Sequence, residues 1–181
     1  MTERPNPALG IARVAIGRAE GLKEFGRTVQ SFLSSLAPLL AFPLAGALIE
    51  LVRGGVELAL ATVAISLILQ LVPPVVSHAL AVRWKREEQW LHYATAYNWC
   101  FWALPLVLAV LTVVFGIAIG AGLPDWLGAN GVLAVLGLYS FWLHWFVARH
   151  ALDLSRWRAG LLVVAVNAAA LLLVIGPAQL G

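Results

Sequence analysis

Five long apolar stretches, separated by short polar turns, dominate this sequence of 181 residues. They cover residues 31–51, 56–80, 93–123, 127–147 and 159–180. A helix needs about 20 mostly apolar residues to cross the hydrocarbon core of a bilayer, and each stretch reaches that length. In lipid, only helices and closed barrels satisfy all of their backbone polar groups. The pattern therefore predicts an all-α, polytopic membrane protein with five transmembrane helices.

The charge content supports a membrane protein and argues against a nucleic-acid-binding protein. Charged residues make up 12% of the chain and hydrophobic residues 61%, whereas soluble domains are about one-quarter charged. The net charge of +3 comes from Lys and Arg residues that lie outside the apolar stretches. Such residues meet anionic lipid headgroups at a membrane surface. We therefore expect the lipid bilayer, and no nucleic acid, as the partner of these charges.

The positions of the basic residues predict the orientation of the chain. Five crossings place the N-terminus and the second and fourth connecting loops on one side of the membrane. That side carries eleven of the 12 Lys and Arg residues: Arg4, Arg13, Arg18, Lys23, Arg27, Arg83, Lys85, Arg86, Arg149, Arg156 and Arg158. Only Arg53 is left for the other side. Because short cytoplasmic loops are enriched in Lys and Arg, we expect a cytoplasmic N-terminus and an external C-terminus.

Residues 1–30, the N-terminal segment, differ from the five-helix domain of residues 31–181. Apolar and basic residues alternate with glycines from Pro5 to Thr28. One interpretation is a short amphipathic helix at the membrane interface, with its basic face toward the headgroups. The alternative is a partly ordered tail, because glycines destabilise helices. We favour the interfacial helix, and we expect no cleavable signal peptide, since no apolar run precedes Ser31.

A few polar residues lie at a similar depth within the predicted spans. His78 and His144 each lie five residues before a basic residue that ends a span, about 7 Å along a helix. Together with Tyr97, Asn98 and Tyr139 they form a predicted polar layer in the cytoplasmic leaflet. Intramembrane polar residues suggest a site for a proton, an ion or a lipid headgroup. The preferred interpretation is interhelical hydrogen bonding, worth about 0.6 kcal/mol per pair.

At the outer end of the second span, Arg53 and Glu57 are spaced for an i,i+4 ion pair. The sequence has no HExxH, CxxC or Gly-rich phosphate loop, and its single cysteine, Cys100, excludes cysteine-based metal clusters. Two histidines without a third ligand make a poor zinc site. We therefore expect no catalytic residues, no metal and no cofactor.

Three short motifs carry a resemblance to a known family. They are FGRTVQSFLSSL at residues 25–36, TAYNW at Thr95–Trp99 and WFVARHAL at Trp145–Leu152. In these the chain resembles small bacterial membrane proteins that are distant relatives of the five-span Yip family. The resemblance implies a bacterial inner-membrane protein with a cytoplasmic N-terminus, five helices and no catalytic residues. Eukaryotic Yip relatives bind small GTPases, but we do not carry this partner over, because their long N-terminal region is reduced here to residues 1–30.

Two functions follow as hypotheses. The first is a non-enzymatic scaffold, accessory or lipid-organising protein with a membrane-protein partner or a second copy of itself. The alternative is a small transporter or channel subunit that uses the predicted polar layer. Because the chain has no internal repeat, such a transporter would have to oligomerise.

Overall fold

The structure, a computed structural model, describes residues 5–175. In chain order the helices are α1 (Pro7–Ala15), the short 3-10 helix η1 (Ala19–Glu24), α2 (Val29–Val52), α3 (Val56–Arg83), α4 (Glu87–Cys100), α5 (Ala103–Gly120), α6 (Asp125–Ala151) and α7 (Arg156–Ile175). Within residues 5–175 there is no strand. The prediction of an all-α chain is confirmed.

The prediction of five spans is also confirmed by length and composition. Among the described residues, five helical segments are long and apolar enough to cross a membrane: Val29–Val52, Val56–Arg83, Glu87–Gly120, Asp125–Ala151 and Arg156–Ile175. Residues 176–180 of the predicted fifth span, and residues 1–4 of the N-terminal segment, lie outside the described residues. The predicted boundaries of the second and fourth spans lie within four residues of the observed ones.

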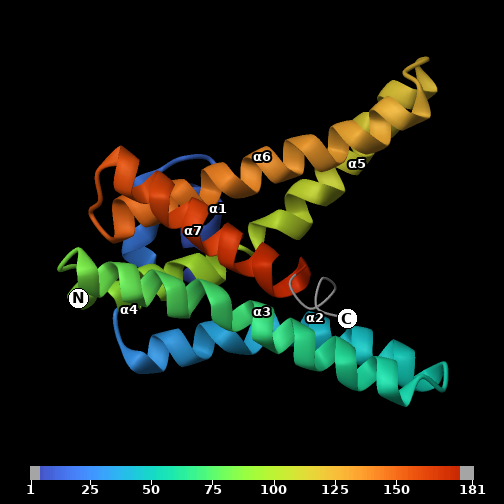
Figure 1. Cartoon of the computed structure of the whole chain (residues 1–181). Coiled ribbons are helices and arrows are strands. Elements are labelled where there is room, and N and C mark those ends of the chain that lie inside the picture. Colours follow the sequence, from blue (N-terminus) through green and yellow to red (C-terminus); the bar gives the residue numbers. More distant parts are fainter. Residues whose placement is uncertain (1–4, 176–181) are drawn as a thin grey trace.

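The helices meet at one end of the molecule and diverge toward the other (Figure 1). The α3–α4 turn and the α6–α7 turn lie side by side at the first end, joined by a 3.2 Å ion pair between Arg86 and Asp153. We call this the basic end, because it carries Arg83, Lys85, Arg86, Arg149, Arg156 and Arg158. From it, the α2–α3 and α5–α6 hairpins diverge, and α7 packs against both α3 and α6.

The buried core lies toward the basic end. Its largest fully buried side chains include Tyr93, Leu143, Leu152 and Leu162. The two hairpins instead expose large apolar side chains, such as Leu60 on α3 and Leu138 on α6. Exposed apolar surface of this extent is unfavourable in water, and the hydrocarbon of a bilayer solvates it. The core therefore holds the helices together at one end, and the hairpins present surface suited to lipid.

The predicted third span of residues 93–123 consists of two helices in the structure. Helix α4 ends at Cys100 and α5 begins at Ala103. Pro105 has no N–H to donate to the carbonyl of Phe101, so the regular hydrogen-bond pattern fails at this point. The Phe101 carbonyl instead accepts a bond from the Leu104 N–H at 3.1 Å. The sequence signal for this break was the proline itself.

Two other prolines do not break their helix. Pro73 and Pro74 lie inside α3, which remains helical from Val56 to Arg83. Two adjacent prolines remove two backbone donors, which favours a kink or an unwound turn, and the continuous helix excludes the unwound turn. Pro43 in α2 leaves the carbonyl of Leu39 without its helical donor, and the Gln70 side chain of α3 donates to that carbonyl at 3.0 Å.

The predicted ion pair between Arg53 and Glu57 is wrong. Arg53 pairs with Glu50, at 3.5 Å between Nη1 and Oε1. Helix α2 ends at Val52, and the turn through Gly54 uses a left-handed backbone conformation (φ +83°) before α3 begins. The i,i+4 spacing assumed a continuous helix. Because the turn separates them, Arg53 and the exposed Glu57 do not share a helix face.

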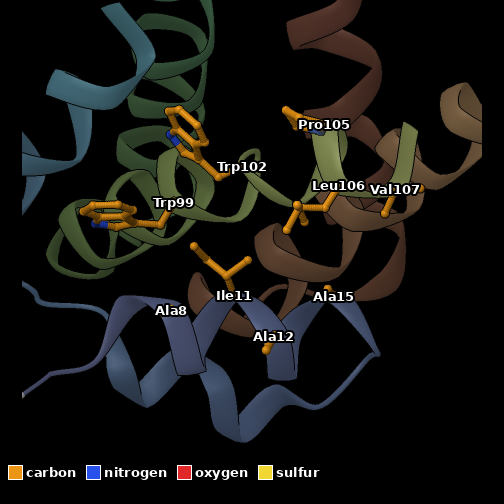
Figure 2. A pocket seen from close by; sticks show the side chains of 10 residues that line it. Ala8, Ile11, Ala12, Ala15, Trp99, Trp102, Pro105, Leu106 and Val107 are labelled. Carbon is orange, nitrogen blue, oxygen red and sulfur yellow. The ribbon is translucent and has the colours of Figure 1, made fainter. Parts of the chain in front are cut away.

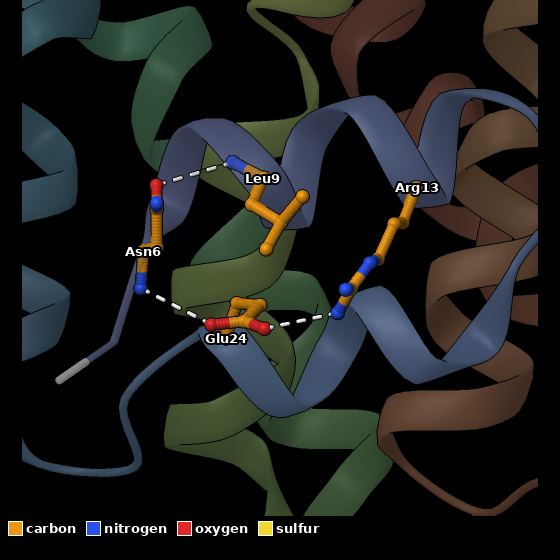
Figure 3. Close-up of polar contacts among 4 residues, drawn as sticks. All are labelled: Asn6, Leu9, Arg13 and Glu24. Atoms are coloured by element: carbon orange, nitrogen blue, oxygen red, sulfur yellow. Dashed lines mark hydrogen bonds and ion pairs between the residues drawn. The ribbon is translucent and has the colours of Figure 1, made fainter. Parts of the chain in front are cut away.

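The N-terminal segment contains the predicted helix, α1, folded back against η1 (Figure 3). The Glu24 carboxylate accepts a bond from the Asn6 backbone N–H at 3.2 Å and pairs with Arg13 at 3.1 Å. The two helices approach closely at Gly10 and Gly21, where an added Cβ on Gly21 would lie 2.7 Å from the Gly10 carbonyl oxygen. A tail would lack these contacts, so the segment is a compact helical pair.

The N-terminal segment shares the core of the spanning helices. Val14, Leu22 and Phe25 are buried in the same cluster as Tyr93 of α4 and Val147 of α6. The predicted boundary after residue 30 therefore separates two sequence compositions, whereas the buried core is continuous across it.

Candidate functional site

Helix α4 lies at the centre of the molecule, packed against α1, α2, α3 and α6. Although it is the most polar of the long helices, its side chains are buried around most of its circumference, including His92, Thr95 and Asn98. Polar side chains buried in this way need hydrogen-bond partners. Thr95 donates to the Leu91 carbonyl of its own helix at 2.8 Å, and the other partners come from η1, α2, α3 and α6.

Tyr93 and His144 link α4 to α6. The Tyr93 hydroxyl and His144 Nε2 share a hydrogen bond of 2.9 Å, and both side chains are almost completely buried. Tyr97, one turn further along α4, lies against the imidazole with ring centroids 4.6 Å apart. The imidazole of His144 is therefore enclosed by aromatic rings and has one polar neighbour, a phenol.

Two further bonds link α4 to α2 and α3. Asn98 donates from Nδ2 to the Ser35 hydroxyl at 2.9 Å, and Ser35 in turn donates to the Phe32 carbonyl. Trp90 donates from its indole N–H to the Ser77 hydroxyl at 3.0 Å. We call Ser35, Ser77, Trp90, Tyr93, Tyr97, Asn98 and His144 the α4 polar cluster.

The cluster is tightly packed. The void beside it, lined by Pro73, Pro74, Ser77, Tyr93, Ala94, Tyr97 and Asn98, has no room for a water molecule. An ion or a substrate needs at least the space of one water molecule and polar groups directed into it. In this conformation Trp90, Tyr93 and Asn98 of α4 bond directly to side chains of neighbouring helices.

Three of the five residues of the predicted polar layer belong to this cluster. Tyr97 and His144 are in direct contact, and Asn98 lies on the neighbouring face of α4. His78 is exposed on the outside of α3. Its ring and that of Trp90 are arranged edge to face, with centroids 4.8 Å apart. His78 therefore touches the edge of the cluster through Trp90, while rotation about the α3 axis leaves its side chain exposed.

Tyr139, the fifth residue of the predicted polar layer, bonds to the N-terminal segment and not to the α4 polar cluster. Its hydroxyl donates to the Ala15 carbonyl at the C-terminal end of α1, at 2.9 Å. His92 makes an equivalent contact, with Nε2 donating to the Leu22 carbonyl at 2.8 Å. The Ala15 carbonyl is at the end of α1, where intrahelical donors are no longer available, and the Leu22 carbonyl accepts the His92 bond in addition to one from the Phe25 N–H at 3.2 Å. Tyr139 and His92 therefore attach the N-terminal segment to the spanning helices.

Tyr93, Ser35 and Ser77 were not identified from the sequence. Tyr93 is the first residue of the predicted third span, but α4 begins six residues earlier, at Glu87. The i,i+4 spacing of Tyr93 and Tyr97 was the signal that places both rings on one helix face. The serines carried no such signal, because small hydroxyl residues are common in membrane helices.

The chemistry available to this site is limited. The part of the chain that the structure describes holds no group of three His, Cys, Asp or Glu side chains placed to bind a metal ion. His144 has a phenol and aromatic rings around it, and no carboxylate contacts it among the described residues. An imidazolium there would be a buried charge without a counter-ion, which is costly. The arrangement suits helix packing.

Comparisons with protein-family models, curated proteins and solved structures found no match to this chain. Any functional inference therefore depends on the contacts described above. The central observation is a polar cluster whose hydrogen bonds join α4 to three other spanning helices.

Proposed function

We propose that this chain is a non-enzymatic integral membrane protein that acts as a scaffold or accessory subunit for other membrane components. The closed packing of the α4 polar cluster carries this proposal. A transporter site would need space beside the polar groups, and the adjoining void has no room for water. A scaffold does not need such space. It needs a set of helices held in one arrangement by interhelical bonds.

The divergent hairpins support the same function. The α2–α3 and α5–α6 hairpins diverge from each other (Figure 1), and both expose large apolar side chains. A helix pair of this kind can pack against lipid or against the helices of another membrane protein. Such a partner, or a second copy of the chain, is part of the proposal.

The basic end gives the proposed orientation. Its Arg and Lys residues favour the side of the membrane with anionic headgroups, so we place the N-terminal segment in the cytoplasm and the C-terminus outside. The resemblance to bacterial Yip-type proteins agrees with this orientation and with an inner-membrane location. Both the family and the membrane remain proposals.

Isolation of the tagged, full-length chain in native nanodiscs would test the scaffold function. We expect native mass spectrometry to find the chain bound stoichiometrically to a membrane protein or to a second copy. A bulky substitution on one exposed hairpin face, such as Leu138→Trp on α6, should release the partner if that hairpin forms the interface. Leu60→Trp on α3 is the matched variant for the other hairpin. A strictly monomeric chain in all three samples would overturn the proposal.

The alternative function has its own test. Proteoliposomes containing the chain should show no flux of protons or monovalent ions above that of empty vesicles. If flux were present and were abolished by His144→Phe, the transporter hypothesis would replace the scaffold. Tyr139→Phe, which alters a hydroxyl outside the α4 polar cluster, is the control for general damage to the helices.

A further inference from the structure

An apolar groove of about 490 Å³ runs between α1 and the break in the third span (Figure 2). One wall is a single face of α1, formed by Ala8, Ile11, Ala12 and Ala15. The facing wall consists of Trp99 and Trp102 together with the first turn of α5. The walls are almost entirely carbon, and a volume of this size is within the range of about 300–1,000 Å³ found for small-molecule sites.

The groove exists because α1 is held in place by contacts elsewhere. Its opposite face, with Gly10 and Val14, packs against η1. Its C-terminal end accepts the bond from Tyr139, and Arg13 pairs with Glu24. The alanines on the groove face are too small to reach the tryptophans, so a gap remains between two walls that are each fixed independently.

The surroundings of the groove determine what can fill it. Apolar cavities exclude water, because water finds no hydrogen-bond partners there. Leu106 of α5 lines the groove and is 67% exposed, and Val110, one turn further along α5, is 63% exposed. Both residues lie in the candidate span Glu87–Gly120, so the groove is continuous with a surface that faces hydrocarbon.

We propose that this groove binds one acyl chain of a membrane phospholipid, between α1 and the break from α4 to α5. Lipid chains are the apolar material present in excess beside α5. The two tryptophans suit this position, since indole rings concentrate near the boundary between headgroups and hydrocarbon. The site goes beyond the scaffold function and does not depend on it, because a scaffold can bind partners through its hairpins with the groove empty.

Lipid retention in native mass spectrometry would test the site. The full-length chain is reconstituted in nanodiscs of phosphatidylethanolamine and phosphatidylglycerol, then transferred to detergent and washed. We expect one phospholipid to remain per chain. Ala12→Phe places a ring in the groove and should lower the retained phospholipid several-fold. Ala8→Phe fills the same groove and should act in the same way. Both alanines are exposed, so neither ring enters the buried core.

Ala61→Phe is the matched control, since it makes the same substitution at an exposed position of α3 outside the groove. Its retained phospholipid should equal that of the unmodified chain. In parallel, a phospholipid with a diazirine on one acyl chain should cross-link to Ile11 in the unmodified chain and in Ala61→Phe, but not in Ala12→Phe.

Several outcomes would overturn the proposal. Equal phospholipid retention in Ala12→Phe, Ala8→Phe and Ala61→Phe would mean that the groove holds no lipid chain. A retained free fatty acid in place of a phospholipid would identify a different occupant. Far-ultraviolet circular dichroism and thermal unfolding of each variant show that a loss of lipid does not arise from a loss of fold.

Discussion

The hydrogen bond between Tyr93 and His144 joins α4 to α6 where neither side chain meets solvent. Each group would be left with an unsatisfied polar atom if the other were removed, which in a buried site costs more than the bond itself contributes. The hydrogen bond between Asn98 and Ser35 joins α4 to α2 in the same way. Single residues of this cluster therefore position whole helices.

We predict that Tyr93→Phe and His144→Phe are coupled. Removal of the second partner should cost less than removal of the first, because the bond is already absent. A coupling free energy of about 0.6 kcal/mol is expected, the average for interhelical hydrogen bonds in a membrane protein. Unfolding of the single and double variants in mixed micelles measures it.

Tyr139→Phe provides the comparison for this cycle. Its hydroxyl bonds to the Ala15 carbonyl and shares no partner with His144, so the costs of Tyr139→Phe and His144→Phe should add. Additive costs for the Tyr93 and His144 pair would contradict the role we assign to their hydrogen bond.

At the scale of an element, the prolines decide where helices are interrupted and where they need support. Pro105 separates α4 from α5, and Pro43 removes the helical donor from the Leu39 carbonyl. The Gln70 side chain replaces that donor from the neighbouring helix. The α2–α3 hairpin is thereby joined by a polar contact within a segment that is otherwise apolar.

We predict that Gln70→Leu destabilises the α2–α3 hairpin because it leaves the Leu39 carbonyl without a donor in an apolar environment. The cost should be about 1–3 kcal/mol, the range for an unsatisfied buried group. In the background of Pro43→Ala, residue 43 regains a backbone N–H that can bond to Leu39. Gln70→Leu should then cost much less, as measured by unfolding in mixed micelles.

Equal costs of Gln70→Leu in the two backgrounds would show that the side chain acts through some other contact. Gln70→Glu is a useful further variant. In an apolar environment its carboxyl group is protonated and carries one O–H donor for the Leu39 carbonyl, so it should cost less than Gln70→Leu.

The pairing of α1 with η1 leads to a third prediction. In Gly21→Ala the new methyl group would lie 2.7 Å from both the Gly10 carbonyl oxygen and the Arg13 Cβ, so the two helices must move apart. Backbone amides of α1 should then exchange with deuterium faster than in the unmodified chain. Gly116→Ala, where nothing lies within 4 Å of the added methyl group, should leave the exchange of α1 unchanged.

At the scale of the whole molecule, burial is concentrated toward the basic end, and the hairpins carry most of the exposed large apolar side chains. The Arg86–Asp153 pair and the contact of Arg158 with the Trp84 ring, at 6.0 Å, connect the two turns at that end. These exposed contacts are worth little energy individually. Their main consequence comes from position rather than energy. The basic residues lie on one side of the molecule, which favours one orientation in the membrane.

We predict opposite locations for the two ends of the chain. A reporter active only in the cytoplasm should be active before Met1 and inactive after Gly181, because five spans place the ends on opposite sides. An external reporter should give the reverse pattern. Cytoplasmic activity at both ends would contradict an odd number of crossings.

The sequence alone determined the class of this protein, the five spans and the residues that gather at the basic end. These properties follow from two local quantities, the length of an apolar run and the positions of charges. Both determine how a segment inserts into a bilayer. The helix at Pro7–Ala15 was also predictable, since Asn6 and Pro7 are favourable residues for a helix start.

Only the tertiary structure decided which side chains meet. His78 and His144 each lie five residues before a basic residue, yet His78 is exposed and His144 is buried, because each helix is rotated by the packing of its neighbours. Arg53 pairs with Glu50 because of the turn at Gly54. The docking of α1, and with it the groove beside Trp99, depends on bonds between residues more than 50 positions apart, such as Tyr139 with Ala15. Such contacts have no counterpart in the periodicity of a single helix.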